Sequence, residues 1–561
     1  MAGIAFPDLA RQRLWLVVLG AAVLLGAWLR LDQIAAQVLI DDEWHAVHQF
    51  VSHSPREMFF DFGYADYSIP LGMLDWLEAQ AFGVSELTLR WPMLVCGLAT
   101  LVLLPLYVAP RLGRATAAVL TTLIALSPLL VIFSRMARPY AITLLLGWSA
   151  HAAYQRYHAA PRGQFLAAAT YAVLAALCTW LHPVVGPFVA APLLWGFAAL
   201  RNVAPTDRRH AFLRWLALAA WTGAITAALV LPPLLTHPMS LAAKGGADRP
   251  GMDSLIGVWY AWLGTPSTAV VMACVAFAAM GAPTVWRALP VARTGALGLL
   301  LTLGLVMATG IMWSHLPVTI ARYLLPFVPL LLVCVAAGTV RVAIRVMHPA
   351  TPLRKTIGIA ILVLPIALLA ARSPLIPWLR HPNAQMQHLV YYIDFRPDHN
   401  PYLPQFEAIP LSPFWATLGA RSPGSLRIAV APFYFESYDW DAPRWERLSR
   451  QTVLPGYLTG LCVERRGGEL PRDPRYRFTN AVHLADSAAL RSRSIDYVIW
   501  QKPYLLTVAG HSETIGADTA HCEEVLRRKF GTPTYEDSHI IVFPSPSLPS
   551  RADLSAPDAT R

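Results

Sequence analysis

The chain has 561 residues, of which 55% are hydrophobic and 14% are charged, whereas about 25% of residues are charged in a typical soluble domain. This composition and a positive mean hydropathy exclude an ordinary soluble enzyme and indicate a polytopic membrane protein. The formal net charge is +11, but the basic residues of the apolar part lie in short loops. We therefore expect membrane lipids, and no nucleic acid, as partners.

Eleven apolar runs are long enough to cross a bilayer, and together they occupy most of residues 1–371. The first run, Leu14 to Leu29, follows Arg11 and Arg13 and is interpreted as an uncleaved anchor, with a cleaved signal peptide as the alternative. The runs begin near residues 14, 91, 115, 139, 164, 184, 213, 266, 295, 320 and 356. The sequence thus predicts a membrane module of about 11 transmembrane helices.

Basic residues predict the orientation of this module. With a cytoplasmic N-terminus, sixteen Lys and Arg residues of the short loops lie on the cytoplasmic side, and about half as many lie on the other side. An odd number of crossings then places everything after about residue 372 outside the cytoplasm.

Residues 372–544 read as an extracytoplasmic α/β domain. Residues 426–435, 495–504 and 539–544 have the pattern of strands, and residues 522–530 that of a helix. Cys462 and Cys522 lie in this domain, where they either form one disulfide or remain separate thiols. Residues 545–561 are rich in Ser, Pro, Ala and Asp, which predicts a disordered tail.

The carboxylates gather in the first loop, residues 31–90, which is predicted to be periplasmic. Of fourteen acidic residues before residue 372, ten lie in this loop. Asp41, Asp42 and Glu43 are consecutive, and repulsion or burial in such a group raises carboxylate pKa values, which suits a general base. The alternative is a solvated helix start, since acidic residues favour the first turn.

His45 and His48 follow these acids and raise the question of a metal site. Glu43, His45 and His48 are close in sequence, but their spacing is not that of HExxH and a third ligand is not evident. We therefore expect no metal and no cofactor, with a divalent metal as the less favoured alternative.

Arginines on the same predicted side form two further groups. The segment SRMARPYA carries Arg135, Arg138 and Tyr140, and Arg322 and Tyr323 begin a late apolar run. Membrane-edge arginines are costly without a partner, and the planar guanidinium suits a phosphate; the alternative is snorkelling to lipid headgroups. His182 and His315 lie near the same ends of their runs, and they and His45 are possible substrate contacts.

Four motifs together resemble a known family. They are the pair Asp42-Glu43, the stretch Gly83-x-Ser85-Glu86-x-x-x-Arg90, the SRxARPYA element with Arg138, and the Arg322-Tyr323-x-x-Pro326 element. In this order, the chain resembles the GT-C superfamily of integral-membrane glycosyltransferases that use polyprenyl-phosphate-linked sugars. The resemblance covers most of residues 10–345 and points to the protein O-mannosyltransferase and aminoarabinose transferase branch.

The resemblance implies an inverting transfer of one sugar, a hexose or a pentose, to a lipid, glycan or protein acceptor at the periplasmic face of a bacterial inner membrane. Asp42 matches the catalytic carboxylate and Glu43 its partner, with Asp41 as an alternative base. Arg138 would stabilise the departing lipid phosphate, with Arg322 as a second candidate. One departure is the stretch Tyr67 to Leu71, which stands where family members often have His-Pro-Pro-Leu.

Two other classes of protein remain as alternatives. A transporter or lipid-carrier flippase tends to show internal repeats and charges near the bilayer midplane, whereas here the acids gather at one face and no repeat is found. A membrane scaffold without catalysis would leave the group from Asp41 to Glu43 without a role.

Overall fold

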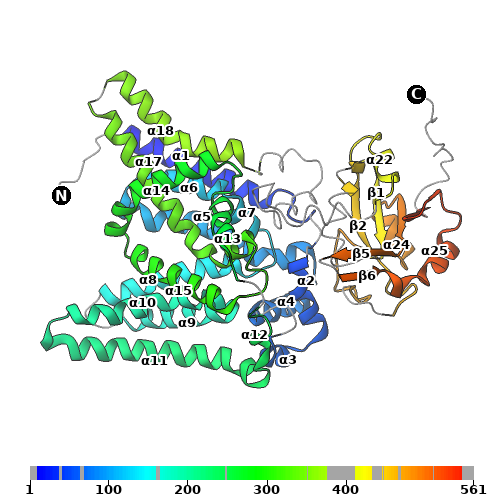
Figure 1. The fold of residues 1–561 in the computed structure, drawn as a ribbon, viewed down its shortest axis with the longest axis horizontal. Helices are drawn as coiled ribbons and strands as arrows, with labels where there is room; N and C mark the ends of the chain where they lie inside the picture. The colour runs from blue at the N-terminus through cyan, green and yellow to red at the C-terminus, as the bar shows by residue number, and fades with distance from the viewer. Residues whose placement is uncertain are drawn as a thin grey trace.

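The computed structural model describes residues 9–36, 39, 41–62, 68–159, 164–246, 249–349, 351–373, 375, 411–432, 445–446, 448–464, 469–508 and 511–545. The side chain of Asp41, Tyr67 and the predicted tail beyond Ser545 lie outside the described part. Helices form one part of the molecule and a mixed sheet the other (Figure 1). Three short helices lie between them: α2 (Asp41–Ser52), α3 (Pro55–Phe60) and α4 (Ile69–Ala81).

A helix coincides with each predicted apolar run. Their bounds are Leu9–Leu31 (α1), Glu86–Leu112 (α5), Arg114–Leu126 (α6), Tyr140–Ala159 (α8), Phe165–Leu181 (α9), Gly186–Ala199 (α10), Pro205–Thr236 (α11), Thr268–Ala288 (α14), Pro290–Thr309 (α15), Val328–Met347 (α17) and Pro352–Arg372 (α18). Within the described ranges, seven helices are long and apolar enough to cross a membrane, and three more apolar helices are shorter. The chain is a multi-pass membrane protein, and the count of eleven crossings stays a prediction.

Close contact between α14 and α17 shows how these helices pack. A Cβ atom at Gly281 would lie 2.0 Å from the carbonyl oxygen of Cys334, and one at Gly338 would lie 1.8 Å from that of Phe277. Only glycine therefore fits at these positions. Small residues let helix backbones approach closely in membranes, where packing replaces the hydrophobic effect as the driving force.

Short helices collect at the end of the bundle that carries the first loop, called here the first-loop end. Besides α2, α3 and α4, these are α7 (Pro128–Phe133), α12 (Met239–Ala242), α13 (Met252–Leu263) and α16 (Pro317–Tyr323). Helix α3 begins with a capping box, in which Ser54 and Glu57 each accept a hydrogen bond from the backbone N–H of the other. The Thr236 hydroxyl at the end of α11 donates to the Phe60 carbonyl and connects α11 to α3.

The C-terminal part is a mixed six-stranded sheet of order β3-β2-β1-β4-β8-β7. Strand β1 pairs in parallel with β2 and β4, whereas β4 and β8 are antiparallel. The strands are Arg427–Ala431 (β1), Thr452–Tyr457 (β2), Val482–His483 (β3), Tyr497–Gln501 (β4), Tyr535–Glu536 (β7) and Ile540–Pro544 (β8), with a separate hairpin of Tyr504–Val508 (β5) and His511–Ile515 (β6). Helices α22 (Phe414–Leu418), α24 (Ser487–Ser492) and α25 (Cys522–Phe530) complete it.

This structure confirms the predicted strands β1, β4 and β8 and the predicted helix α25. In α25, Cys522, Leu526 and Phe530 are buried, because a spacing of four places them on one face of the helix. Cys522 also forms a disulfide with Cys462. Of the two states that the sequence left open for these cysteines, the structure therefore has the disulfide.

The sheet part is joined to the first-loop end by backbone contacts. Val84 donates its N–H to the Arg475 carbonyl at 2.7 Å and accepts the N–H of Arg477 at 2.7 Å. Gly83 beside it has φ +75°, and a Cβ atom there would lie 2.8 Å from the Arg475 carbonyl oxygen. Glycine is therefore required both by the backbone conformation and by the close approach of the second chain segment.

Candidate active site

An ion pair joins two of the predicted site residues that lie about half of the chain apart in sequence. The Arg322 guanidinium donates from Nη1 to Oδ2 of Asp42. Both side chains are largely enclosed, with 12% and 10% of their surface exposed. Asp42 comes from the first turn of α2 and Arg322 from the end of α16, so tertiary packing brings an acid and a cation together at the first-loop end.

Arg138 lies beside the same acid. Its Nη1 donates to the backbone carbonyl of Asp42 at 3.1 Å, and the residue is 6% exposed. The motif resemblance favoured Arg138 over Arg322 as the phosphate-binding cation, and the structure places both arginines at Asp42. The roles of the two arginines toward a phosphate stay predictions.

Glu43, the next residue, is an anchor for the first loop. Arg90 of α5 donates from Nε and Nη2 to the two carboxylate oxygens of Glu43, both at 2.7 Å. The backbone N–H of Ala137, in the SRMARPYA segment, donates to the same carboxylate at 2.8 Å. A two-pronged contact of this kind fixes orientation as well as charge. Glu43 therefore holds α2, α5 and the SRMARPYA segment in one arrangement beside Asp42.

Aromatic rings surround the guanidinium of Arg322. Its carbon atom Cζ lies 5.9 Å from the centre of the Tyr140 ring and 5.5 Å from that of the Tyr323 ring. The His182 ring lies 5.3 Å from each of these two rings. Ring faces attract a cation at such distances. Tyr140, His182 and Tyr323, all predicted from the sequence, thus belong to one cluster with Asp42 and Arg322.

The remaining predicted site residues are Arg135, His45 and His315. Arg135 donates to the Leu29 carbonyl at 2.8 Å and so contacts the end of α1. His45 is half-buried on α2. The His315 carbonyl accepts a hydrogen bond from the Ser254 hydroxyl at 2.6 Å, and its ring lies 6.2 Å from that of Trp313.

A group of metal ligands is not found in the part of the chain that the structure describes. No three His, Cys, Asp or Glu side chains there are close enough together to hold a metal ion. His48 was raised above as a possible metal ligand together with Glu43 and His45. The centre of its ring lies 6.0 Å from that of Trp44. The described side chains at the site are carboxylates, guanidinium groups and aromatic rings.

Helix α4 contributes a further acid to the first loop. Burial raises the pKa of Glu78 to about 7. This shift favours the protonated form of Glu78 in comparison with an exposed glutamate.

Glu86 and Arg90, in the stretch Gly83 to Arg90, make contacts that were not predicted from the sequence. Arg90 is fully buried and pairs with Glu43. Glu86 accepts the backbone N–H groups of Asn480 at 2.8 Å and Thr479 at 3.1 Å. One turn of α5 therefore connects the site to the sheet part. A buried arginine at the start of an apolar run was the available signal, because such a cation requires a partner.

Comparison with known proteins adds similarities of structure. No family model matches the chain, and no curated protein matches it. Solved structures that are similar to it include ArnT from Cupriavidus metallidurans in the apo state, with 11% identity over 96% of this chain and 99% of that one and a TM-score of 0.44.

Two further similar structures are the arabinofuranosyltransferase AftD from Mycobacteria and the oligosaccharyltransferase of Archaeoglobus fulgidus. The first has 16% identity, covers 95% of this chain and 40% of that chain, and has a TM-score of 0.45. The second has 13% identity, covers 86% and 68%, and has a TM-score of 0.38. At these identities the similarity is one of fold.

Proposed function

We propose that this chain is an inverting glycosyltransferase that moves one sugar from a polyprenyl-phosphate donor to an acceptor at the non-cytoplasmic face of the membrane. The observation that carries the proposal is the enclosed pair of Asp42 and Arg322 with Arg138 at its edge. A carboxylate and two cations at one membrane face provide the groups needed for transfer from a phosphate leaving group. The motif resemblance supports the same reaction.

Asp42 is assigned as the general base. Its carboxylate takes the proton of an acceptor hydroxyl or amine while the acceptor atom attacks the anomeric carbon. The bond between that carbon and the phosphate oxygen breaks, its electron pair stays on the phosphate, and the configuration at the carbon is inverted. General bases in enzymes contribute about 10²- to 10⁴-fold to a rate.

The two arginines are assigned to the leaving group. Negative charge grows on the phosphate as the bond breaks, so a fixed cation stabilises the transition state more than the ground state. A donor phosphate near Arg322 would compete with Asp42 for the guanidinium. Donor binding thus weakens the ion pair and leaves the Asp42 carboxylate available to the acceptor proton.

Glu43 and Arg90 are assigned to positioning. Their carboxylate and guanidinium are satisfied by each other and by the Ala137 and Ile34 backbone. They are 0% and 1% exposed as side chains, which removes them from direct contact with a polar substrate. Their contribution is to fix the positions of the neighbouring Asp42 and of the SRMARPYA segment.

The test uses the purified full-length chain in detergent with a panel of undecaprenyl-phosphate hexoses and pentoses and an extract of cell-envelope acceptors. Release of undecaprenyl phosphate is measured by mass spectrometry. We expect Asp42→Asn to lower the release at least about 10²-fold, because the amide cannot accept the proton. Asp61→Asn is the matched control, since Asp61 belongs to the same loop but is 39% exposed and lies near His237.

Equal release by Asp42→Asn and the wild type would remove the assigned base. Equal loss in both variants would show a general effect of first-loop charge rather than catalysis by Asp42. Turnover of none of the donors by a wild-type chain that is folded by its melting profile would contradict the proposed donor class.

A further inference from the structure

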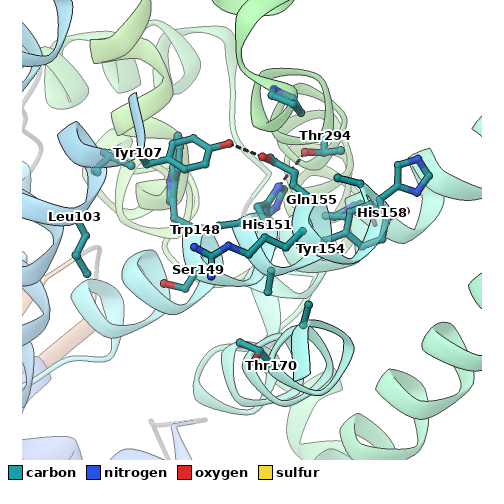
Figure 2. A pocket seen from close by; sticks show the side chains of 18 of the residues that line it. Leu103, Tyr107, Trp148, Ser149, His151, Tyr154, Gln155, His158, Thr170 and Thr294 are labelled. Atoms are coloured by element: carbon teal, nitrogen blue, oxygen red, sulfur yellow. Dashed lines mark hydrogen bonds between the residues drawn. The ribbon is translucent and has the colours of Figure 1, made fainter. Parts of the chain in front are cut away.

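A large cavity extends along α8 from near the candidate active site to the opposite end of the bundle. It has a volume of about 1310 Å³ and is lined by residues of α5, α8, α9, α10 and α15. The side chains around it include Tyr107, Trp148 and Tyr154 (Figure 2). Its lining on α8 begins at Leu144, about 6 Å along the helix from Tyr140, and includes Arg156 at about 24 Å, with 1.5 Å per residue. The charged end of the cavity is therefore distant from the active site.

Four of the polar side chains that line the cavity are hydrogen-bonded to one another in pairs. The Tyr107 hydroxyl donates to Oε1 of Gln155 at 2.7 Å, and the His151 and Thr294 side chains are hydrogen-bonded at 2.9 Å (Figure 2). The second ring nitrogen of His151 lies 3.0 Å from the Phe188 carbonyl oxygen. These groups need no partner from a ligand, so the interior suits an apolar chain better than a polar molecule.

One side of the cavity opens toward lipid. Leu103 and Leu106 of α5, Leu166 of α9 and Trp195 of α10 line it and are 52%, 56%, 78% and 39% exposed. Such side chains on membrane-crossing helices face hydrocarbon rather than water. A ligand therefore has access to the cavity sideways from the bilayer.

The helix ends around the cavity carry arginines. Arg111 ends α5, Arg156 is in the last turn of α8, and Arg293 is in the first turn of α15. Among the described residues, no aspartate or glutamate lines the cavity. The rim therefore has a net positive charge, in contrast to the active site, where a carboxylate accompanies the cations.

We propose that this cavity binds an anionic phospholipid, with its acyl chains in the apolar interior and its phosphate at Arg111, Arg156 and Arg293. Basic pockets between membrane helices at the arginine-rich side suit lipid phosphates. The volume exceeds the range of about 300–1,000 Å³ that is common for small-molecule pockets, in keeping with a ligand that has more than one acyl chain. The site is independent of the proposed transferase reaction.

The experiment measures thermal unfolding of the full-length chain in non-ionic detergent during titration with cardiolipin, phosphatidylglycerol, phosphatidylcholine or inorganic phosphate. The variant is the double change Arg156→Ala/Arg293→Ala. Its matched control, Arg209→Ala/Arg345→Ala, removes the same charge at the same end from exposed positions outside the cavity. A third variant, Ser149→Trp, fills the cavity from α8 and leaves the arginines in place.

We expect the anionic lipids to raise the melting temperature and phosphatidylcholine to have a smaller effect. The double cavity variant should bind them about 25-fold more weakly, at about fivefold for each arginine, and the control should bind like the wild type. Ser149→Trp should also lose the response. Normal melting of Arg156→Ala/Arg293→Ala in the absence of lipid would establish that the variant folds. Its lost response to lipid would then report a loss of binding.

Three results would overturn the proposal. An equal response to phosphatidylcholine would mean that the cavity holds chains without regard to headgroup charge. An equal response to inorganic phosphate would mean that the acyl chains are not part of the ligand. Equal weakening in the control variant would mean that general surface charge, not the cavity, attracts the lipid.

Discussion

The two ends of the helix bundle use arginine in opposite ways. At the first-loop end, Arg90 and Arg322 are enclosed and paired with Glu43 and Asp42. At the other end, the arginines around the cavity are accompanied by no carboxylate among the described lining residues. Paired, enclosed charges fix a geometry, whereas unpaired charges at a membrane surface attract anions from outside. The comparison separates a site built for a reaction from a site built for binding.

Backbone contacts distinguish the ends as well. The first-loop end is covered by α2, α3 and α4 and is joined to the sheet part through Val84 and Glu86 (Figure 1). Trp44 and Met93 of this end belong to the same hydrophobic core as Trp415 of the sheet part. Changes at the first-loop end are therefore expected to affect both parts of the molecule, and changes at the other end only one.

The largest difference is expected from removing an acid at each end. Glu43→Ala leaves the buried Arg90 cation without its carboxylate, and breaking a buried ion pair costs about 3–5 kcal/mol. Asp207→Ala removes an exposed acid in the first turn of α11, where the cost is about 0.3–1 kcal/mol. Thermal unfolding of both variants in detergent measures the difference, and similar melting temperatures would contradict the anchoring role of Glu43.

A smaller difference is expected from removing an arginine at each end. Arg322→Ala should lower sugar transfer about 10²- to 10³-fold, the usual loss for one group that stabilises transition-state charge. Arg209→Ala, at the other end and outside the cavity, should transfer sugar at the wild-type rate. The donor-release assay gives both rates. If the two variants are equally active, Arg322 does not serve the leaving group.

The smallest difference is expected from the same change at the two ends of α5. Gly83 and Gly113 both have positive φ, at +75° and +87°, so alanine strains the backbone at either position. A new Cβ at Gly83 also approaches the Arg475 carbonyl, whereas nothing lies within 4 Å of one at Gly113. Gly83→Ala should therefore unfold at a lower temperature than Gly113→Ala. Overpacking at Gly83 should lower the free energy of unfolding by about 1–3 kcal/mol.

Susceptibility to proteolysis provides a second measurement for this pair. Gly83→Ala should expose the sheet part to cleavage at a lower protease concentration, because the contact of Val84 with Arg475 and Arg477 is displaced. Equal cleavage of both glycine variants would show that this contact does not hold the sheet part in place.

Much of the fold was predictable from local patterns. Apolar runs gave the positions of the long helices, since a membrane helix must satisfy its backbone within its own segment. The strands β1, β4 and β8 and the helix α25 followed from hydrophobic periodicity. The short strands β3 and β7 have two residues each and were not predicted, because a pattern of period two cannot be recognised in so short a segment.

The sequence identified residues of the candidate site, but it did not predict which of them form ion pairs. Asp42 was singled out because acids gather in the first loop, and Arg138 and Arg322 because membrane-edge cations require a partner. That Arg322 meets Asp42 and that Arg90 meets Glu43 depend on how α2, α5 and α16 are packed. Sequence spacing carries no information about such partners, since Asp42 and Arg322 are 280 residues apart.

The sequence alone determined that the chain lies in a membrane and that most acids of its apolar part belong to the first loop, because the transfer of residues into lipid depends only on their own polarity and on their order. Tertiary structure alone decided that Glu43 anchors the first loop, that Glu86 holds the sheet part, and that a basic cavity lies at the far end of α8. Each of these depends on the relative positions of separate helices, which packing fixes and composition does not.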